Sequence, residues 1–399
     1  MTRRRGLLLA ALAAGCAPVP ATEAGAVSPA GLSAFHAALA ALQAGRRNQV
    51  AVLQIGDSHT ANDGFSSRLR EMMQARFGDA GRGLIPPGIP FKYYRPSRIA
   101  VTAEGWALRS AYDGAAGPYG LALLRQQALG PASMTIRADE AGGLTHVAVD
   151  ALGQPGGGTL DLVFDSGERF AVSTGGNGPV WRQAPAAAAA QSLTVTARGD
   201  GPVDLLGFEL RSGRPGVTWS NLGTIGATMG ITAQWSPALV ASEIRALDPS
   251  LVLLAFGTNE GFKDSTDPEE YRTLYRERLR AVRAMVPRAS VLVVLPPDGA
   301  RRLAAGSTTE PCPPRPGDQA NYAAPPRLAM VRRTQQQLAA ASGLPSWDWS
   351  AAMGGTCSIL PLSRTDPPQA APDLVHLFRP GYRATAELLF AELMRGYPG

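Results

Sequence analysis

The stretch that decides the fold is Val50–Gly64, VAVLQIGDSHTANDG. It opens with an apolar run, which is typical of a short buried strand. The run ends in the small and polar residues GDSH at 56–59, which stop a strand. Apolar residues then recur with helical spacing between positions 65 and 73. The stretch therefore predicts a strand, a tight turn and a helix, with Ser58 exposed at the carboxyl end of the strand.

Ser58 is the candidate nucleophile in this turn. Backbone N–H groups at the start of a helix favour a developing oxyanion. Gly-Asp-Ser is also a common helix cap or turn, so a catalytic interpretation needs partners elsewhere in the chain. Two later stretches supply them. AFGTNE at 255–260 ends a second apolar strand, and DLVH at 373–376 lies near the C-terminus.

These stretches together contain the groups of a nucleophilic acyl-transfer site. Ser58 supplies the nucleophile, and Asn259 supplies an amide donor for an oxyanion. His376 is the candidate base, and Asp373, three residues earlier, can set the tautomer of its imidazole. We therefore expect these four side chains to meet in the folded protein.

GDSH, GTNE and DLVH in this order resemble the SGNH, or GDSL-type, hydrolases, a family of esterases, lipases and carbohydrate O-acetylesterases. The resemblance covers about residues 48–92 and 216–399, and it favours the periplasmic peptidoglycan O-acetylesterase branch. It implies a three-layer α/β/α fold with a parallel sheet. It also implies a catalytic triad of Ser58, Asp373 and His376.

The resemblance further implies an oxyanion hole. Its members would be the backbone N–H of Ser58, the side chain of Asn259 and the N–H of a glycine in the GTIGA stretch at 223–227. Gly226 is the favoured glycine, and Gly223 remains open.

The other polar residues beside these motifs are expected to have supporting roles. Asp57 is expected to fix the turn, and His59, as the neighbour of Ser58, to point away from it. Glu260 is expected to orient Asn259, to form part of the cleft wall or to face solvent.

The apolar pattern changes between the two parts of the resemblance. Residues 97–214 contain runs that alternate with a period of two, such as Thr159–Phe164 and Leu193–Thr196, separated by Gly, Asp and Pro turns. Such short strands predict an inserted all-β sandwich, jelly-roll-like in form. The family branch carries a carbohydrate-binding-module-like sandwich at this place. The insertion would therefore either bind a glycan or only shape the cleft.

Several aromatic residues are candidates for stacking on a sugar ring. For four of them core packing is favoured: Trp106, Tyr112, Tyr119 and Trp181. For Tyr93 and Tyr94 an interface between domains is favoured. The alanine run Ala186–Ala190 predicts a loop.

The N-terminus has the pattern of an export signal, with a basic start, a short apolar run and small residues before Cys16. The run is too short to span a bilayer. Ala14-Gly15-Cys16 resembles a bacterial lipoprotein processing site, which predicts lipidation of Cys16. Simple secretion is the alternative, and Arg3-Arg4 also resembles a twin-arginine signal. We expect the protein in the periplasm, tethered to a membrane if Cys16 is lipidated.

The chain thus divides into five expected parts. They are an export signal of residues 1–16, a linker of 17–30, a first hydrolase part of 31–96, an inserted β-sandwich of 97–215 and a second hydrolase part of 216–399.

The remaining composition limits cofactors and partners. Cys312 and Cys357 lie in loop-like stretches of an exported chain, which predicts a disulfide between them, with two unpaired thiols as the alternative. The histidines are scattered, so no metal or other cofactor is expected. The net charge of +6 is spread over isolated arginines, so no nucleic-acid site is expected.

The expected function is that of a serine esterase that removes O-acetyl groups from a cell-envelope polysaccharide through an acetyl-enzyme. The resemblance favours peptidoglycan, with acetyl groups on MurNAc, as the substrate. Two alternatives remain: a polysaccharide O-acetyltransferase with the same triad, and a non-catalytic glycan-binding wall lipoprotein.

Overall fold

The computed structural model describes residues 27–139, 143–304, 306–307, 309–313 and 321–399. The export signal, Cys16 and most of the expected linker lie outside the described residues.

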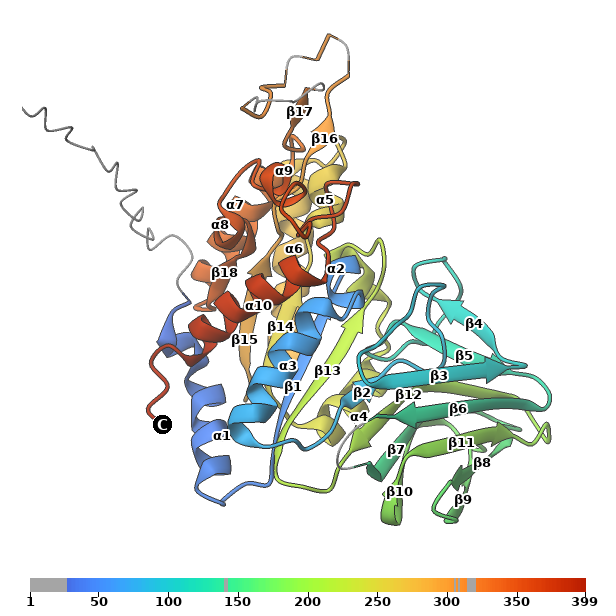
Figure 1. Ribbon diagram of the computed structural model, residues 1–399. Helices are drawn as coiled ribbons and strands as arrows, with labels where there is room; N and C mark the ends of the chain where they lie inside the picture. The colour runs from blue at the N-terminus through green and yellow to red at the C-terminus, as the bar shows by residue number, and fades with distance from the viewer. Residues whose placement is uncertain (1–26, 140–142, 305, 308, 314–320) are drawn as a thin grey trace, which may run out of the picture.

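A parallel five-stranded sheet forms the centre of the α/β part (Figure 1). Its strands in spatial order are β13 (Gly216–Gly223), β1 (Gln49–Gly56), β14 (Pro249–Ala255), β15 (Ser290–Leu295) and β18 (Ser346–Asp348). Both faces of this sheet are covered, which explains why its strands are continuous apolar runs. The strand order changes direction around β1, and ligands of open α/β sheets bind outside the carboxyl ends of the strands at such a point.

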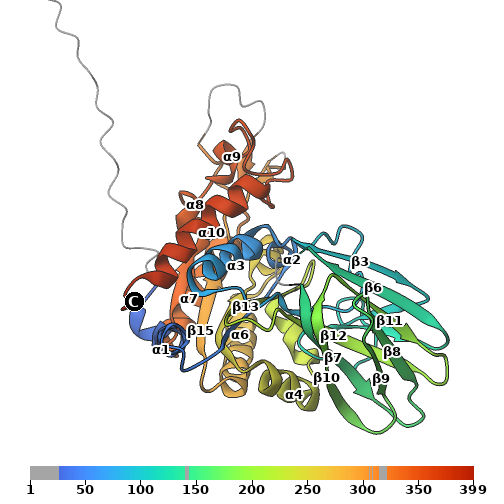
Figure 2. The same ribbon diagram turned by 60° about the horizontal axis from the view of Figure 1, so that its bottom comes forward.

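Helices cover both faces of the sheet (Figure 2). One face carries α1 (Ser33–Gln43), α3 (Gly64–Phe77), α8 (Trp349–Met353), α9 (Ile359–Leu362) and α10 (Arg379–Met394). The other face carries α4 (Pro237–Leu247), α6 (Pro268–Met285) and α7 (Leu328–Ala341). Short elements complete this part: η1 (Pro29–Leu32), α2 (Ser58–Ala61), η2 (Met229–Gln234), α5 (Thr258–Phe262), β16 (Arg301–Arg302) and β17 (Tyr322–Ala323).

The inserted part consists of two antiparallel sheets. One contains β10 (Gly178–Ala190), β7 (Leu144–Gly153), β12 (Val203–Arg211), β5 (Leu124–Ala128) and β4 (Ala107–Ser110), and β2 (Gly83–Ile85) also pairs with β12. The other contains β3 (Ile99–Glu104), β6 (Ala132–Ala138), β11 (Ser192–Ala197), β8 (Thr159–Phe164) and β9 (Arg169–Ser173). A shared apolar core lies between them. The prediction of a three-layer α/β/α fold with an inserted all-β sandwich is confirmed.

Two details differ from the sequence expectations. Ala186–Ala190, expected as a loop, belongs to β10, which pairs with β7 along most of its length and shifts register between Pro185 and Ala190. Backbone pairing with a neighbouring strand outweighs the weak local preference of alanine here. In addition, β2 joins the inserted sheet before residue 97, where the insertion was expected to begin.

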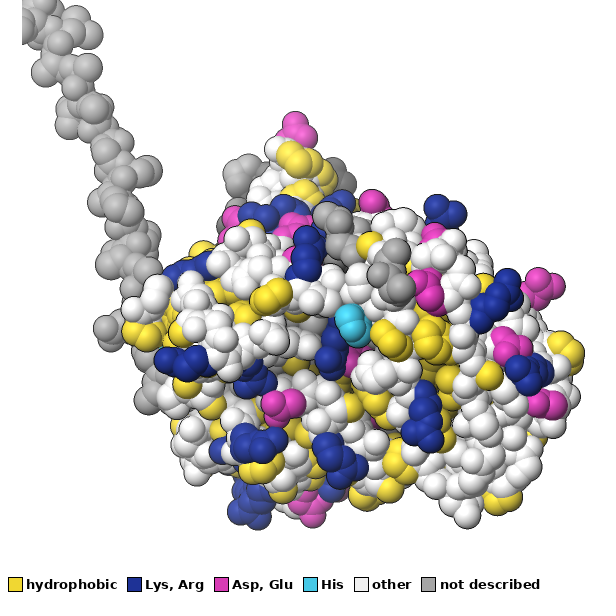
Figure 3. All heavy atoms as spheres, turned by 90° about the horizontal axis from the view of Figure 1, so that it is seen from below, with side chains coloured by type: hydrophobic (Ala, Val, Ile, Leu, Met, Phe, Trp, Pro, Cys, Tyr) yellow, Lys and Arg dark blue, Asp and Glu magenta, His cyan; other side chains and the backbone are white. Residues whose placement is uncertain are grey.

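Charged side chains on the face drawn in Figure 3 are dispersed. Lys and Arg side chains are interspersed with Asp and Glu and with apolar patches, and on that face they do not gather into one basic area.

Candidate active site

Three side chains from distant parts of the chain meet at the carboxyl end of the parallel sheet. Ser58 Oγ lies 2.8 Å from His376 Nε2, and His376 Nδ1 lies 2.7 Å from Asp373 Oδ2. Both separations are hydrogen-bond distances. A serine in contact with an imidazole that is itself held by a carboxylate can lose its proton to that imidazole as it attacks a carbonyl carbon.

The backbone between β1 and α2 places Ser58 at the sheet edge. A Cβ on Gly56 would lie 2.4 Å from the carbonyl oxygen of Ala255 on β14, so only glycine fits there. Asp57 caps α2 by accepting the N–H of His59 at 3.0 Å. Burial raises the pKa of Asp57 to about 6. Asp57 therefore fixes the turn, as the sequence indicated, and is not bonded to the His376 imidazole.

A tight turn brings Asp373 back onto His376. Asp373 Oδ1 accepts the backbone N–H groups of Val375 and His376, both at 3.0 Å, while Oδ2 binds the imidazole. Leu374 adopts a positive φ of 55° to allow this. Partial burial alone would raise the pKa of Asp373, but the hydrogen bonds from His376 and Val375 outweigh it and hold the pKa below its usual value. The carboxylate is thus ionised and oriented.

His59 lies beneath the site and not in it. Its Nδ1 is 3.0 Å from the hydroxyl of Tyr382 on α10, and its ring centre is 5.1 Å from that of His376. Burial, with the neighbouring His376 as a smaller cause, lowers the pKa of His59 to about 3. A neutral ring therefore packs against the ring of His376 without competing for the Ser58 proton.

The groups expected for an oxyanion hole follow the carboxyl ends of three adjacent strands, β1, β13 and β14. The Ser58 N–H is at the start of α2, and Gly226 sits in the turn after β13 with a positive φ of 75°. Neither N–H donates to another residue that the structure describes. The Asn259 amide follows β14 and donates one of its two hydrogens to the Ala227 carbonyl at 2.7 Å, which leaves the second hydrogen for a ligand.

The geometry separates the two candidate glycines. The N–H of Gly223 donates to Asn221 Oδ1 at 3.2 Å, and a Cβ on Gly223 would lie 2.1 Å from the backbone nitrogen of Ala61. Gly223 is thus needed for close packing of β13 on α2. Gly226 is the glycine whose N–H is free.

Glu260 has a structural partner that the sequence did not reveal. Its buried carboxylate accepts the N–H of Met229 at 2.8 Å, while the preceding Asn259 holds Ala227. Two consecutive side chains therefore fix the segment that follows Gly226. Burial raises the pKa of Glu260 to about 7. Of its three expected roles, facing solvent is excluded because the residue is buried.

Tyr112 is the residue of the inserted sandwich that reaches the site. A Cβ added to Gly226 would lie 2.3 Å from the Tyr112 hydroxyl, so the phenol packs directly on that glycine. The side chain is nevertheless 54% exposed. Core packing was favoured for it, and that expectation is wrong because the turn after β4 carries it outward. The Asp113-Gly114 pair that follows is the turn signal that could have identified it.

The other aromatic candidates do not share this position. Tyr119 is fully buried, and Trp106 and Trp181 pack against apolar cores. Tyr93 is 74% exposed, so it does not fill an interface between the described domains. Only the turn carrying Tyr112 brings an aromatic of this set against Gly226.

The remaining sequence expectations concern cysteines, metals and membranes. Cys312 and Cys357 form a disulfide. Within the described ranges, no group of three or more His, Cys, Asp or Glu side chains is placed to hold a metal ion. No helix in the same ranges is both long enough and apolar enough to cross a bilayer.

Comparisons with known proteins bear on the family and on the fold, and the matched range of the family model begins after Ser58. The GDSL-like lipase/acylhydrolase family matches residues 188–384, which include Gly226, Asn259, Asp373 and His376. A peptidoglycan O-acetylesterase structure is similar with a TM-score of 0.74 and 26% identity, covering 91% of this chain and 96% of that one.

Two more distant structures also match. Family two carbohydrate esterases from Clostridium thermocellum, in complex with cellohexaose, and from Cellvibrio japonicus have TM-scores of 0.32 and 0.29 and identities of 13% and 10%. They cover 74% and 79% of this chain and 98% of each of those chains. No curated protein matches the chain.

The fold and the family together define the class of this protein as a carboxylic ester hydrolase. The family match and the similar structure confirm the resemblance to the GDSL-type, or SGNH, hydrolases that the three motifs predicted.

Proposed function

We propose that this hydrolase removes O-acetyl groups from a cell-envelope polysaccharide, with peptidoglycan as the substrate. The observation that carries the proposal is the linked pair of short contacts from Ser58 to His376 and from His376 to Asp373. Similarity to a peptidoglycan O-acetylesterase along nearly the whole of both chains supports the choice of polymer.

The first half-reaction forms an acetyl-enzyme. Ser58 Oγ attacks the acetyl carbonyl carbon while His376 Nε2 takes the hydroxyl proton. The carbonyl oxygen becomes an oxyanion that accepts hydrogen bonds from the N–H groups of Ser58 and Gly226 and from the Asn259 amide. His376 then gives its proton to the sugar oxygen, the C–O bond to the acetyl carbon breaks, and the sugar hydroxyl leaves.

The second half-reaction releases acetate. Water attacks the acetyl carbon, His376 takes a proton from that water, and Ser58 leaves with the proton that His376 returns. The side chains of His376 and Asp373 are 36% and 49% exposed, so water has direct access to the imidazole. This exposure favours hydrolysis over transfer to a second sugar, because a transferase must keep water from its acyl-enzyme.

The inserted sandwich has a defined part in this proposal. It places the exposed ring of Tyr112 against Gly226, beside the position of the acetyl group. An aromatic ring offers a flat apolar face and a polar hydroxyl, which suits a sugar ring. We assign to Tyr112 the positioning of the sugar that carries the ester.

We also propose that the enzyme works in the periplasm and is lipidated at Cys16. Support comes from the export pattern of residues 1–16 and from the disulfide between Cys312 and Cys357, because such bonds persist in oxidising compartments. Labelling with a lipid precursor, compared between the parent and Cys16→Ala, tests the anchor.

The test of function is acetate release from O-acetylated peptidoglycan by the parent enzyme and by Ser58→Ala. We expect release by the parent and near-background release by the variant. Release from a small acetyl ester but not from peptidoglycan would keep the triad and reject the polymer. Acetylated sugar products in the presence of a glycan acceptor would indicate a transferase. Glycan retention by both proteins without any turnover would indicate a binding protein.

A further inference from the structure

A cavity of about 370 Å³ is lined partly by residues that closely follow Ser58 and His376 in the chain, and it has no part in the mechanism above. Its walls come from the start of α3, from the loop before β3 and from Arg379 at the start of α10. Asn62 on its wall donates its N–H to the Ser58 carbonyl at 3.0 Å. The backbone of Asn62 is therefore bonded directly to that of the nucleophile, which ties this wall of the cavity to the active site.

Three arginines line this cavity: Arg95, Arg98 and Arg379. All three are exposed, and none forms an ion pair with a carboxylate that the structure describes. Arg95 donates to the Tyr94 carbonyl and Arg98 to the Asp139 carbonyl, so most of their N–H groups remain available. Guanidinium groups bind carboxylates and phosphates with paired hydrogen bonds. We call this cavity the arginine pocket.

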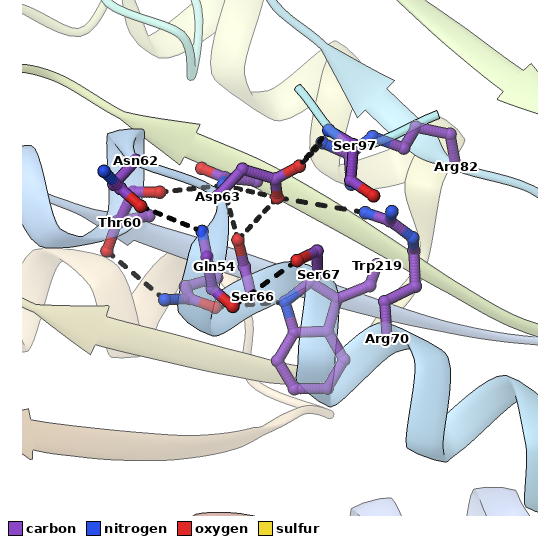
Figure 4. A network of polar contacts seen from close by, with 12 residues as sticks. Gln54, Thr60, Asn62, Asp63, Ser66, Ser67, Arg70, Arg82, Ser97 and Trp219 are labelled. Carbon is purple, nitrogen blue, oxygen red and sulfur yellow. Dashed lines mark hydrogen bonds and ion pairs between the residues drawn. The ribbon is translucent and has the colours of Figure 1, made fainter. Parts of the chain in front are cut away.

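Asp63 also lines the pocket, but its carboxylate is already bound by neighbouring residues of the protein (Figure 4). Its Oδ2 accepts Arg82 at 3.0 Å and the N–H of Ser97 at 2.7 Å. Its Oδ1 accepts the Ser66 hydroxyl at 2.7 Å and lies 3.9 Å from Arg70.

The charges beneath the pocket do not balance. Arg70 and Arg82 are 1% and 3% exposed, and several of their guanidinium nitrogens have no hydrogen-bond partner among the described residues. Among the described residues, both arginines form their ion pairs with Asp63 alone, so one positive charge is left uncompensated. Burial strengthens the electrostatic interactions of that charge, because the surrounding medium screens them less than water does. Asp63 is the lining residue that contacts both arginines, so the charge behind this wall of the pocket favours an anion.

We propose that the arginine pocket binds a carboxylate of the substrate that lies close to the acetyl ester, on the acetylated sugar itself or on a group attached to it. This inference rests on the proposed function and narrows it. Peptidoglycan carries such carboxylates on the lactyl group of its muramyl sugars and on its stem peptides, whereas neutral acetylated glycans carry none. The pocket would thus make the enzyme select acidic acetylated glycans.

The test compares a charged substrate with a neutral amide of similar size, and adds a third substrate that carries a stem peptide. An O-acetylated muramyl disaccharide is prepared with a free lactyl carboxylate, with that carboxylate converted to a methyl amide, and with a stem peptide attached. The ratio of kcat/KM for the acid to that for the amide is measured for the parent, for Arg95→Gln/Arg98→Gln/Arg379→Gln and for the control Arg280→Gln on α6. Dividing the two values removes any general damage to the triad.

We expect a ratio of about ten or more for the parent and for Arg280→Gln, near one for the triple variant, and lower in concentrated salt because screening weakens charge pairing. A preference for the peptide-bearing substrate over the free acid would place the bound carboxylate on the peptide. A parent ratio near one for both charged substrates would overturn the proposal. Equal losses on acid and amide in the triple variant would also overturn it.

Binding measurements distinguish a failure of the arginine-pocket proposal from a failure of the proposed esterase function. Calorimetric titration of Ser58→Ala with the same acid and amide needs no turnover. If acetate release fails but Ser58→Ala still binds the acid about tenfold more tightly, the esterase proposal fails and the pocket stands. Equal affinities for acid and amide would reject the pocket even in an active esterase.

Discussion

The amide of Asn259 has two hydrogens, and the fold assigns them different partners. One is held by the Ala227 carbonyl, and we propose that the other binds the developing oxyanion. We predict that Asn259→Ala lowers kcat by about 100- to 1000-fold with little change in KM, because the lost bond forms mainly in the transition state. Steady-state kinetics on a small acetyl ester measure this. Asn177→Ala, an exposed asparagine of the sandwich, is the control. A rise in KM at unchanged kcat would contradict the assignment.

Gly226 combines two constraints, a positive φ and contact with Tyr112. Gly45 has a similar φ of 67° and no atom within 4 Å of an added Cβ, so Gly45→Ala measures the backbone strain alone. We predict that Gly45→Ala loses about 1–2 kcal/mol of unfolding free energy from strain. Gly226→Ala should lose at least as much, because its Cβ also meets the Tyr112 hydroxyl, and it should lose at least tenfold in kcat.

Denaturant unfolding and kinetics on the same preparations separate these effects. Full activity of Gly226→Ala would contradict the prediction, because it would show that this turn keeps its geometry with a side chain at position 226.

At the scale of elements, the turn between β4 and β5 links the sandwich to the catalytic part. It holds Tyr112 against Gly226, although the two turns follow strands of different sheets, β4 and β13. We predict that Tyr112→Ala raises KM for acetylated peptidoglycan about three- to tenfold, the loss of an aromatic contact of ~0.5–1.5 kcal/mol. Tyr112→Phe should retain most of the affinity, because its ring can still stack.

Kinetics on the polymer test this, with Leu129→Ala, another exposed side chain of the sandwich, as the control. If Phe and Ala at position 112 lose affinity equally, the hydroxyl and not the ring would be the group that matters.

At the scale of the whole molecule, a buried carboxyl pair joins the inserted sandwich to the α/β part. Asp150 on β7 faces Glu243 on α4, and Glu243 also accepts the Leu121 N–H at 2.7 Å. Burial raises the pKa of both groups, that of Glu243 to about 7. A carboxyl group whose pKa rises on folding binds its proton more tightly in the folded state. Its contribution to stability is therefore present below its unfolded pKa and is lost as the pH rises through about 7.

We predict that the unfolding free energy of the parent falls between about pH 4.5 and 7 relative to that of Glu243→Gln, by about 1 kcal/mol or more. The glutamine can keep the bond to Leu121 and donate to Asp150 without titrating. Denaturant unfolding across this pH range measures the difference, with the exposed Glu277→Gln as the control. Parallel pH profiles for the parent and Glu243→Gln would contradict the prediction.

The sequence by itself determined the elements and the reactive residue types. Apolar runs that end in GDSH and GTNE predict strands that deliver Ser58 and Asn259 to one sheet edge, because parallel strands present their carboxyl ends together. The change of apolar period likewise marked the inserted sandwich. These signals are local, because strand and helix periodicity depend on residues only a few positions apart.

Only the tertiary structure decided which residues meet. Ser58 and His376 are 318 positions apart, and their contact depends on how the sheet and α10 pack. Packing between distant segments also decides three other features. They are the preference for Gly226 over Gly223, the position of Tyr112 and the arginine pocket. Each joins segments from different elements, and contacts of that kind are fixed by packing and burial, which leave no periodic trace in the sequence.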